Sequence, residues 1–424
     1  MAFRVRSILI SLLAGASVQA APALAADSDD DALSLSSAPV EKTPQAPRNT
    51  RFFVEGALGV ADLRDGSGTR SLRRLSFDFV HASNFAPGWR AVLSDRLDHM
   101  RPAEGAPDTI NSLREAYVSW QQQSARSAVD VGRINLRYGP GYGYNPTDFF
   151  RDGALRTITS INPFALRENR LGTVVVRGQG LWSTGSVSLA WSPKLRDHAS
   201  TNGADIDLGA TNNRDRGLFV FSSQLSDRIS GQVLLYKDRG LPVQFGASLT
   251  ALVTEAIVAY AEGSRGREPD LLSRTLAIGP FEKTRNRFVT GLTYTTASKL
   301  SITGEYEYNG FALSPAQFEA LGGIDPALPA AYVLQAVRRQ DLASRQAWLL
   351  YATQKNIGLL GLELTALLRY NAGDHSRLAW LELRRHWDRY DVALRLQQQG
   401  GRDTTEYGLI PQRRSAQVVG NVYF

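Results

Sequence analysis

The chain has 424 residues, no cysteine, 37 glycines and a formal net charge of +7. Hydrophobic residues make up 43 % and charged residues 21 % of the chain, a composition that excludes a disordered protein. The missing cysteine excludes disulfides, thiolate metal sites and cysteine nucleophiles. Arginine supplies 42 of the 48 basic residues, and this excess fits nucleic acid, anionic lipid or an acidic solute as a partner.

Residues 1–25 have the pattern of a secretory signal peptide. A basic start precedes an apolar stretch over 8–16, and Ala-Leu-Ala at 23–25 is a small-residue cleavage site. The apolar stretch is too short for a membrane anchor. Residues 26–50 carry three prolines and five acidic residues against two basic ones, and we expect a disordered periplasmic tether there.

From residue 51 to residue 424 the apolar positions recur with a period of two. In LSITGEYEYN, residues 300–309, leucine, isoleucine and tyrosine alternate with serine, threonine and glutamate, as on a strand with one apolar face. Such runs are about ten residues long, which suits a tilted strand that crosses a bilayer. Because no apolar run of about 18 residues follows the signal peptide, only a closed β-barrel remains as a membrane form.

Eighteen segments carry this pattern, an even number as in bacterial single-chain barrels, with 16 as the alternative count. We therefore predict an all-β, antiparallel transmembrane barrel over 51–424 with both termini in the periplasm. The expected strands are 52–62, 71–83, 88–97, 110–122, 126–136, 170–178, 183–192, 216–225, 228–237, 243–250, 254–263, 285–296, 299–309, 344–354, 358–370, 376–386, 389–398 and 415–424.

The connections between these strands alternate in length, which is typical of short periplasmic turns and long outer loops. The long ones lie near 98–109, 137–169, 193–215, 264–284 and 310–343. The last segment, RRSAQVVGNVYF, alternates apolar residues and ends in Phe424. It resembles the C-terminal strand of bacterial outer-membrane β-barrels of the porin type, although Val422 stands where that family often has an aromatic residue. The resemblance implies recognition of Phe424 by the barrel-insertion machinery, and it extends over 51–424.

Connection 137–169 follows the fifth expected strand and is therefore the third outer loop; it contains GPGYGYNP, residues 139–146. This density of glycine and proline indicates a fixed turn, and Thr147 or Asp148 can cap a short helix over 149–156. Similar porins often fold their third outer loop inward, which implies that loop 137–169 narrows the lumen; an outer lid whose tyrosines pack on the rim is the alternative. The loop residues expected to face solute are Arg137, Tyr138, Tyr142, Tyr144, Asn145 and Asp148.

Strand alternation also predicts charged residues on the lumen wall. Both signs occur, so the wall is either simply solvated or forms a solute-binding ladder. The residues placed inward are Glu55, Asp78, Glu115, Arg133, Glu305, Glu307, Glu363, Arg369, Glu382, Arg384, Asp391 and Arg395. Arginines at strand ends are suited to the phosphates of outer-membrane lipid and lipopolysaccharide.

Enzyme motifs are missing from the sequence: it has no G-x-S-x-G, no H-E-x-x-H and no histidine cluster. We expect no catalysis, no cofactor, no metal and no nucleic-acid partner. The predicted function is a bacterial outer-membrane channel, monomeric or trimeric, for passive passage of small hydrophilic solutes with a preference for anions. The alternative is a dedicated export or surface-assembly barrel for an acidic exopolysaccharide.

Overall fold

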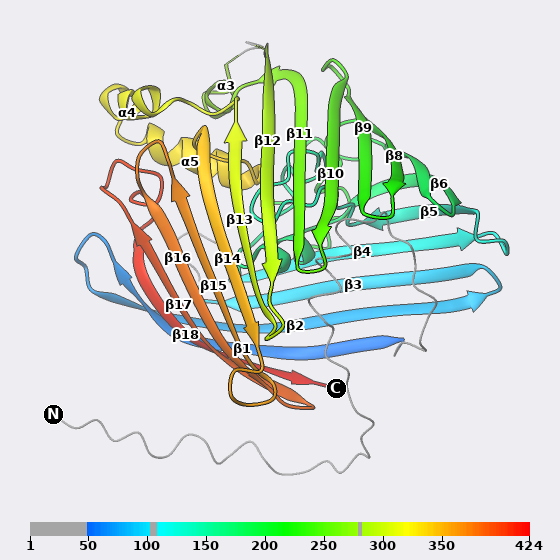
Figure 1. The fold of residues 1–424 in the computed structure, drawn as a ribbon. Helices are drawn as coiled ribbons and strands as arrows, with labels where there is room; N and C mark the ends of the chain where they lie inside the picture. Colours follow the sequence, from blue (N-terminus) through cyan, green and yellow to red (C-terminus); the bar gives the residue numbers. More distant parts are fainter. Residues whose placement is uncertain (1–48, 102–107, 279–281) are drawn as a thin grey trace.

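The computed structural model describes residues 49–101, 108–278 and 282–424. The predicted signal peptide and the tether up to residue 48 lie outside this part of the chain. The described residues form one antiparallel sheet of 18 strands, in which each strand pairs with its neighbours in sequence and β18 pairs with β1 (Figure 1). The sheet therefore closes into a barrel and leaves no free edge.

The strands follow one another around the barrel in chain order. They are β1 (Thr50–Leu63), β2 (Thr69–Ala86), β3 (Trp89–Met100), β4 (Thr109–Gln121), β5 (Ser127–Ile134), β6 (Thr173–Trp182), β7 (Gly185–Ser192), β8 (Arg216–Ser226), β9 (Ile229–Asp238), β10 (Gln244–Thr254), β11 (Ile257–Pro269), β12 (Glu282–Thr295), β13 (Leu300–Asn309), β14 (Gln346–Lys355), β15 (Leu362–Asn371), β16 (Arg377–His386), β17 (Tyr390–Gly400) and β18 (Gln412–Tyr423).

All 18 predicted strands are present, and the antiparallel barrel is confirmed. Some boundaries differ by several residues, because a turn or a strand is longer than expected. β15 begins at Leu362 rather than near residue 358, because Gly358 and Gly361 both adopt positive φ, 65° and 77°, in the preceding turn. β11 extends to Pro269, six residues beyond its expected end, since it keeps pairing with β12 up to Pro269.

Burial is inverted relative to a soluble protein, with apolar side chains outside and charged ones inside. On β1, Leu58 and Val60 are 64 % and 52 % exposed, whereas Glu55 is buried. On β18, Val418 and Val422 are exposed as the alternation predicted. This pattern suits a barrel with lipid outside and a polar interior. Among the described residues, no helix is both long and apolar enough to cross a membrane.

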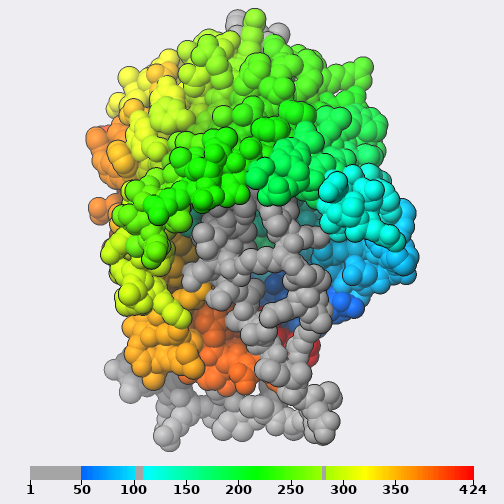
Figure 2. Space-filling model, turned by 45° about the vertical axis from the view of Figure 1, so that its right-hand side comes forward, coloured from blue at the N-terminus to red at the C-terminus, as the bar shows by residue number. Residues whose placement is uncertain are grey.

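The two ends of the barrel differ. The connections numbered here L1 to L9 begin at one end, the loop end, and their described residues are 64–68 (L1), 101 and 108 (L2), 135–172 (L3), 193–215 (L4), 239–243 (L5), 270–278 (L6), 310–345 (L7), 372–376 (L8) and 401–411 (L9). Short turns form the other end, the turn end, where Thr50 and Tyr423 also lie. Figure 2 shows the surface hollowed at the turn end, between the strands coloured green and those coloured blue.

Helices occur only in the loops among the described residues. They are α2 (Pro163–Glu168), α3 (Leu271–Thr275), α4 (Pro315–Ile324) and α5 (Leu328–Arg338). The last three gather at the loop end (Figure 1), where Leu271, Phe318 and Tyr332 share a small apolar core. The expected helix over 149–156 is wrong: Asp148 pairs with Arg170 (2.7 Å) instead of capping a helix.

Loop L9 carries a carboxyl group that titrates near neutrality. Asn371 donates to Glu406 (2.7 Å). Burial raises the pKa of Glu406 to about 7, while Arg369 lowers it and Asp374 raises it by smaller amounts. Because the folded state holds this proton more tightly than the unfolded chain, ionisation opposes folding. The contribution to stability is therefore fully present below a pH of about 4.5 and is lost as the pH rises to about 7.

We expect Glu406→Gln to remove this dependence. The difference in unfolding temperature between the variant and the natural chain should widen, in favour of the variant, from pH 4.5 to pH 7.5. Thermal unfolding of both proteins in the same detergent, over a pH series, measures it. A difference that stays constant across the series would contradict the assignment.

Candidate functional site: the lumen and its third loop

Loop L3 enters the barrel and is held there by two buried carboxyl groups of the wall. Glu305 of β13 accepts from the backbone N–H groups of Tyr142 (2.5 Å) and Gly143 (2.8 Å). Glu262 of β11 accepts from the N–H groups of Gly141 (3.2 Å) and Thr147 (2.8 Å). Since both carboxyl groups lie on the interior face of the sheet, the GPGYGYNP turn lies inside the barrel.

The tyrosines of this turn are packed against the wall. Tyr142 is 9 % exposed and lies in an aromatic cluster with Tyr260, Tyr351 and Phe164. Tyr144 is 2 % exposed, and its hydroxyl donates to Asp341 of L7 (2.6 Å). These two side chains therefore fix the loop in position. That they also contact a solute stays a prediction.

The other predicted loop residues differ in exposure. Asn145 is buried and its amide donates to the carbonyl of Gly141 (2.6 Å). Asp148 is buried in its ion pair with Arg170. Tyr138 is partly buried against the core inside β5–β9, whereas Arg137 is exposed.

Arg133 and Glu115 also form hydrogen bonds with the backbone of L3, one at each end of the loop. Arg133 is 1 % exposed and its Nε donates to the carbonyl of Gly172 (3.0 Å), where L3 ends. Glu115 accepts from the N–H of Asn135 (3.3 Å). Both side chains tie the ends of L3 to the wall.

Gly141 is needed for this packing. An added Cβ there would stand 2.2 Å from the carbonyl oxygen of Tyr144, and backbone cannot yield as a flexible side chain can. We expect Gly141→Ala to lower the stability of L3 by about 1–3 kcal/mol and to raise the hydrogen exchange of amides 139–147. Gly178→Ala, whose Cβ would meet nothing within 4 Å, is the control. Unchanged exchange in both variants would contradict the packing.

A second wall, formed by β16, β17 and β1 to β4, carries arginines interleaved with carboxylates. Arg384 contacts Glu382 (2.9 Å) and Asp391 (2.8 Å), and Arg395 also pairs with Glu382. The series continues with Arg74 on Glu55, Arg96 on Glu55 (2.8 Å) and Asp98 (3.0 Å), and Arg114 on Asp78 (2.7 Å). We call these five arginines and five carboxylates the arginine wall.

The structure thus brings Glu382, Arg384, Asp391 and Arg395 together. Of the remaining predicted wall residues, Arg369 pairs with Glu307 (2.6 Å) and donates to the carbonyl of Gly143 (2.9 Å), so both belong to the support of L3. Glu363 lies apart, near the turn end of β15, beside His386 (3.8 Å).

Sequence reasoning missed Arg74, Arg96 and Asp98, although the alternation that places Asp78 inward also places Arg74 inward. Arg114 is a different case. The pairing of β4 with β3 slips at this residue, since Ser94 faces Glu115 and Asp95 faces Leu113. This bulge turns both Arg114 and Glu115 toward the interior, which strict alternation does not allow.

L3 contacts the arginine wall as well as the opposite side of the barrel, where Glu262 and Glu305 hold it. The carbonyl of Thr159 accepts from Arg74 of β2 (3.2 Å) and from Arg395 of β17 (3.4 Å). β2 and β11, where Glu262 holds the loop, are nine strands apart in a ring of 18. L3 therefore runs across the barrel interior from one side to the other.

No protein-family model and no curated protein matches the chain. Solved structures do match. Acinetobacter baumannii OccAB1 is 11 % identical over 89 % of this chain and 96 % of its own, with a TM-score of 0.57. Pseudomonas aeruginosa OpdQ is 9 % identical over 89 % of this chain and 99 % of its own, with a TM-score of 0.54. The chain has the outer-membrane porin fold.

A third structure with this porin fold is Acinetobacter baumannii OccAB4, which is 8 % identical over 90 % of this chain and all of its own, with a TM-score of 0.54. At such identities the likeness concerns the fold alone. The porin-type resemblance of the sequence is thereby confirmed for the barrel, and the roles of individual residues rest on the geometry described above.

Proposed function

We propose that this porin-fold protein is a bacterial outer-membrane channel through which small hydrophilic solutes pass, anions preferentially. The observation that carries the proposal is L3, which crosses the interior and meets the arginine wall at Thr159. A solute that passes this constriction would meet guanidinium groups on one side and loop backbone on the other. Such a constriction selects by size and charge.

The preference for anions is supported by the order of the side chains at this contact. Arg74 and Arg395 reach L3 with their Nη1 atoms, while other nitrogens of the same groups bind Glu55 and Glu382. The positive groups therefore stand nearest the loop. Exposed Arg137, at the start of L3, adds a further positive charge.

Placement in the outer membrane is supported by the closed sheet and its exposed apolar outer face. In the proposed orientation the turn end, with both barrel termini, faces the periplasm and the loop end faces outward. An export barrel for an acidic polysaccharide needs a continuous wide lumen, and L3 lies across it, so the channel for small solutes is favoured.

Planar-bilayer recording tests the proposal. The purified full chain should give stable current steps, with a reversal potential in a KCl gradient displaced toward that of chloride. A barrel that inserts but carries no current at any voltage would contradict the channel. Displacement toward the potassium potential would contradict the preference for anions.

A further inference from the structure

The loop end holds a second arginine cluster, in a cleft remote from the arginine wall. Five arginines line it, contributed by L3, L4, α3, β12 and L7, together with four carboxylates. The arginines are Arg151, Arg214, Arg274, Arg287 and Arg339, and the carboxylates are Asp148, Asp152, Asp238 and Glu268. A fifth carboxylate, Asp341, has no exposed surface and pairs with Arg151 and Arg287 from behind the lining, so the five arginines are matched by five carboxylates, of which Asp152 is one.

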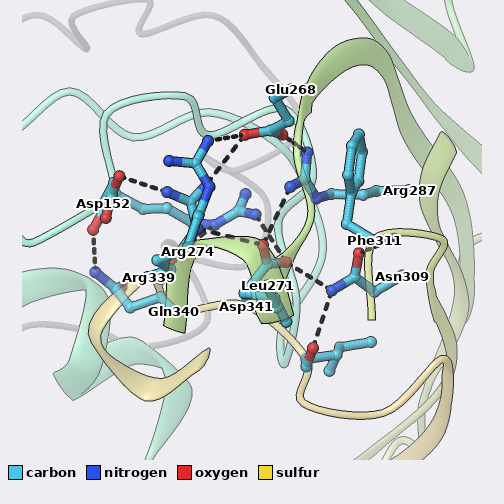
Figure 3. Close-up of polar contacts among 12 residues, drawn as sticks. Asp152, Glu268, Leu271, Arg274, Arg287, Asn309, Phe311, Arg339, Gln340 and Asp341 are labelled. Atoms are coloured by element: carbon cyan, nitrogen blue, oxygen red, sulfur yellow. Dashed lines mark hydrogen bonds and ion pairs between the residues drawn. The ribbon is translucent and has the colours of Figure 1, made fainter. Parts of the chain in front are cut away.

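In the inner part of the cleft, the carboxylates are paired with arginines. Glu268 contacts Arg274 (2.8 Å), Arg287 (2.5 Å) and Arg339 (3.3 Å). Asp341 accepts from Arg287 (3.2 Å) behind them. Figure 3 shows both carboxylates lying between the guanidinium groups. These contacts hold the arginines in place before any ligand arrives, which lowers the entropic cost of binding.

Asp152 is the outer member of the cluster and differs from the other two carboxylates. Its side chain is 28 % exposed and belongs to L3. A single oxygen, Oδ2, accepts from Arg339 (2.6 Å) and from Arg214 (3.0 Å). Burial alone would raise the pKa of Asp152, but Arg339 and Arg214 lower it below its usual value, so it is ionised at neutral pH.

We propose that this cleft is a binding site for the oxyanion group of a solute, a carboxylate or a phosphate, and that Asp152 occupies it when no solute is present. Arg214 and Arg339 offer the forked donors that suit such groups. Arg214 is 28 % exposed, so an anion from the external medium reaches it. Exchange replaces one carboxylate by another oxyanion and releases Asp152 to water, without leaving a buried charge unpaired.

The role of this site in solute passage rests on the proposed channel function. The site adds to that function by identifying an oxyanion as the solute group that is captured first. It also links capture to L3. Asp152 joins L3 to Arg214 of L4 and Arg339 of L7. A bound solute therefore replaces two of the contacts by which L3 is tied to its neighbouring loops.

Calorimetric titration of the full chain in detergent with inorganic phosphate tests the site without any need for conduction. Asp152→Asn removes the internal competitor, and phosphate should then bind about tenfold more tightly. Arg214→Gln removes a donor, and phosphate should bind about tenfold more weakly. Arg239→Gln, which changes a 78 % exposed arginine of L5, is the control and should bind as the natural chain does.

If Asp152 had a purely structural role, Asp152→Asn would loosen the cleft and weaken phosphate binding, as Arg214→Gln does. That result overturns the proposal. Equal binding by all four proteins, or none by any, overturns it too. Acetate in a parallel titration separates carboxylate from phosphate recognition. Because binding is measured without a membrane, loss of the site and failure of the channel in bilayers are separate findings.

Discussion

Replacing Glu305 with leucine is expected to raise the single-channel conductance about twofold or more, because the wall then no longer holds L3 across the lumen. Glu305 accepts from two backbone N–H groups of L3 and from the hydroxyl of Tyr260 (2.6 Å). Each hydrogen bond of this kind contributes about 1–3 kcal/mol when its partner would otherwise be buried without one. Leucine has a similar volume and accepts none.

Two further variants sharpen this test. Glu305→Gln keeps one acceptor oxygen and should raise the conductance less than leucine does. Glu363→Leu makes the same change near the turn end, where the carboxyl group contacts Thr353, Thr365 and His386 rather than L3, and should leave the conductance close to that of the natural chain. If the two leucine variants conduct alike, Glu305 does not hold the constriction.

The second large effect concerns charge. The double substitution Arg74→Gln and Arg395→Gln leaves three arginines facing five carboxylates in the arginine wall. Because the wall then carries an excess of two negative charges beside L3, we expect the reversal potential in a KCl gradient to change sign, from the chloride side to the potassium side.

Arg73→Gln provides the matched control for charge. Arg73 is the sequence neighbour of Arg74, but it is exposed and shares the outer face of β2 with Leu75 and Phe77. Its loss removes a positive charge from the lipid side and should leave the reversal potential unchanged. An unchanged potential in the double variant would show that the selective part of the path lies elsewhere.

The barrel was predictable because one physical contrast governs every strand. Lipid on one face and a polar lumen on the other impose a period of two over 374 residues, and Leu58, Val418 and Glu55 obey it individually. Alternation does not place Arg114 inward, and the cause is local: a single extra residue in β4 changes which side chains point into the barrel there. Nothing in the residues around Arg114 signals this bulge.

The site was predictable only in outline. Chain order placed the third outer loop at 137–169, and its glycines and prolines indicated a fixed turn. The partners that decide what each tyrosine does are more than 100 residues away: Glu305 holds the backbone of Tyr142, and Asp341 holds the hydroxyl of Tyr144. Without those contacts, a tyrosine that anchors the loop and one that faces solute have the same sequence signature.

The most direct test of the central claim uses the absence of cysteine. Ile158 lies on L3 beside Thr159 and is 47 % exposed. In the variant Ile158→Cys, a negatively charged thiol reagent should reduce the current through single channels within seconds, while the natural chain, with no thiol, should be unaffected. Complete modification, verified by mass, with no change in current would contradict an L3 that crosses the conducting path.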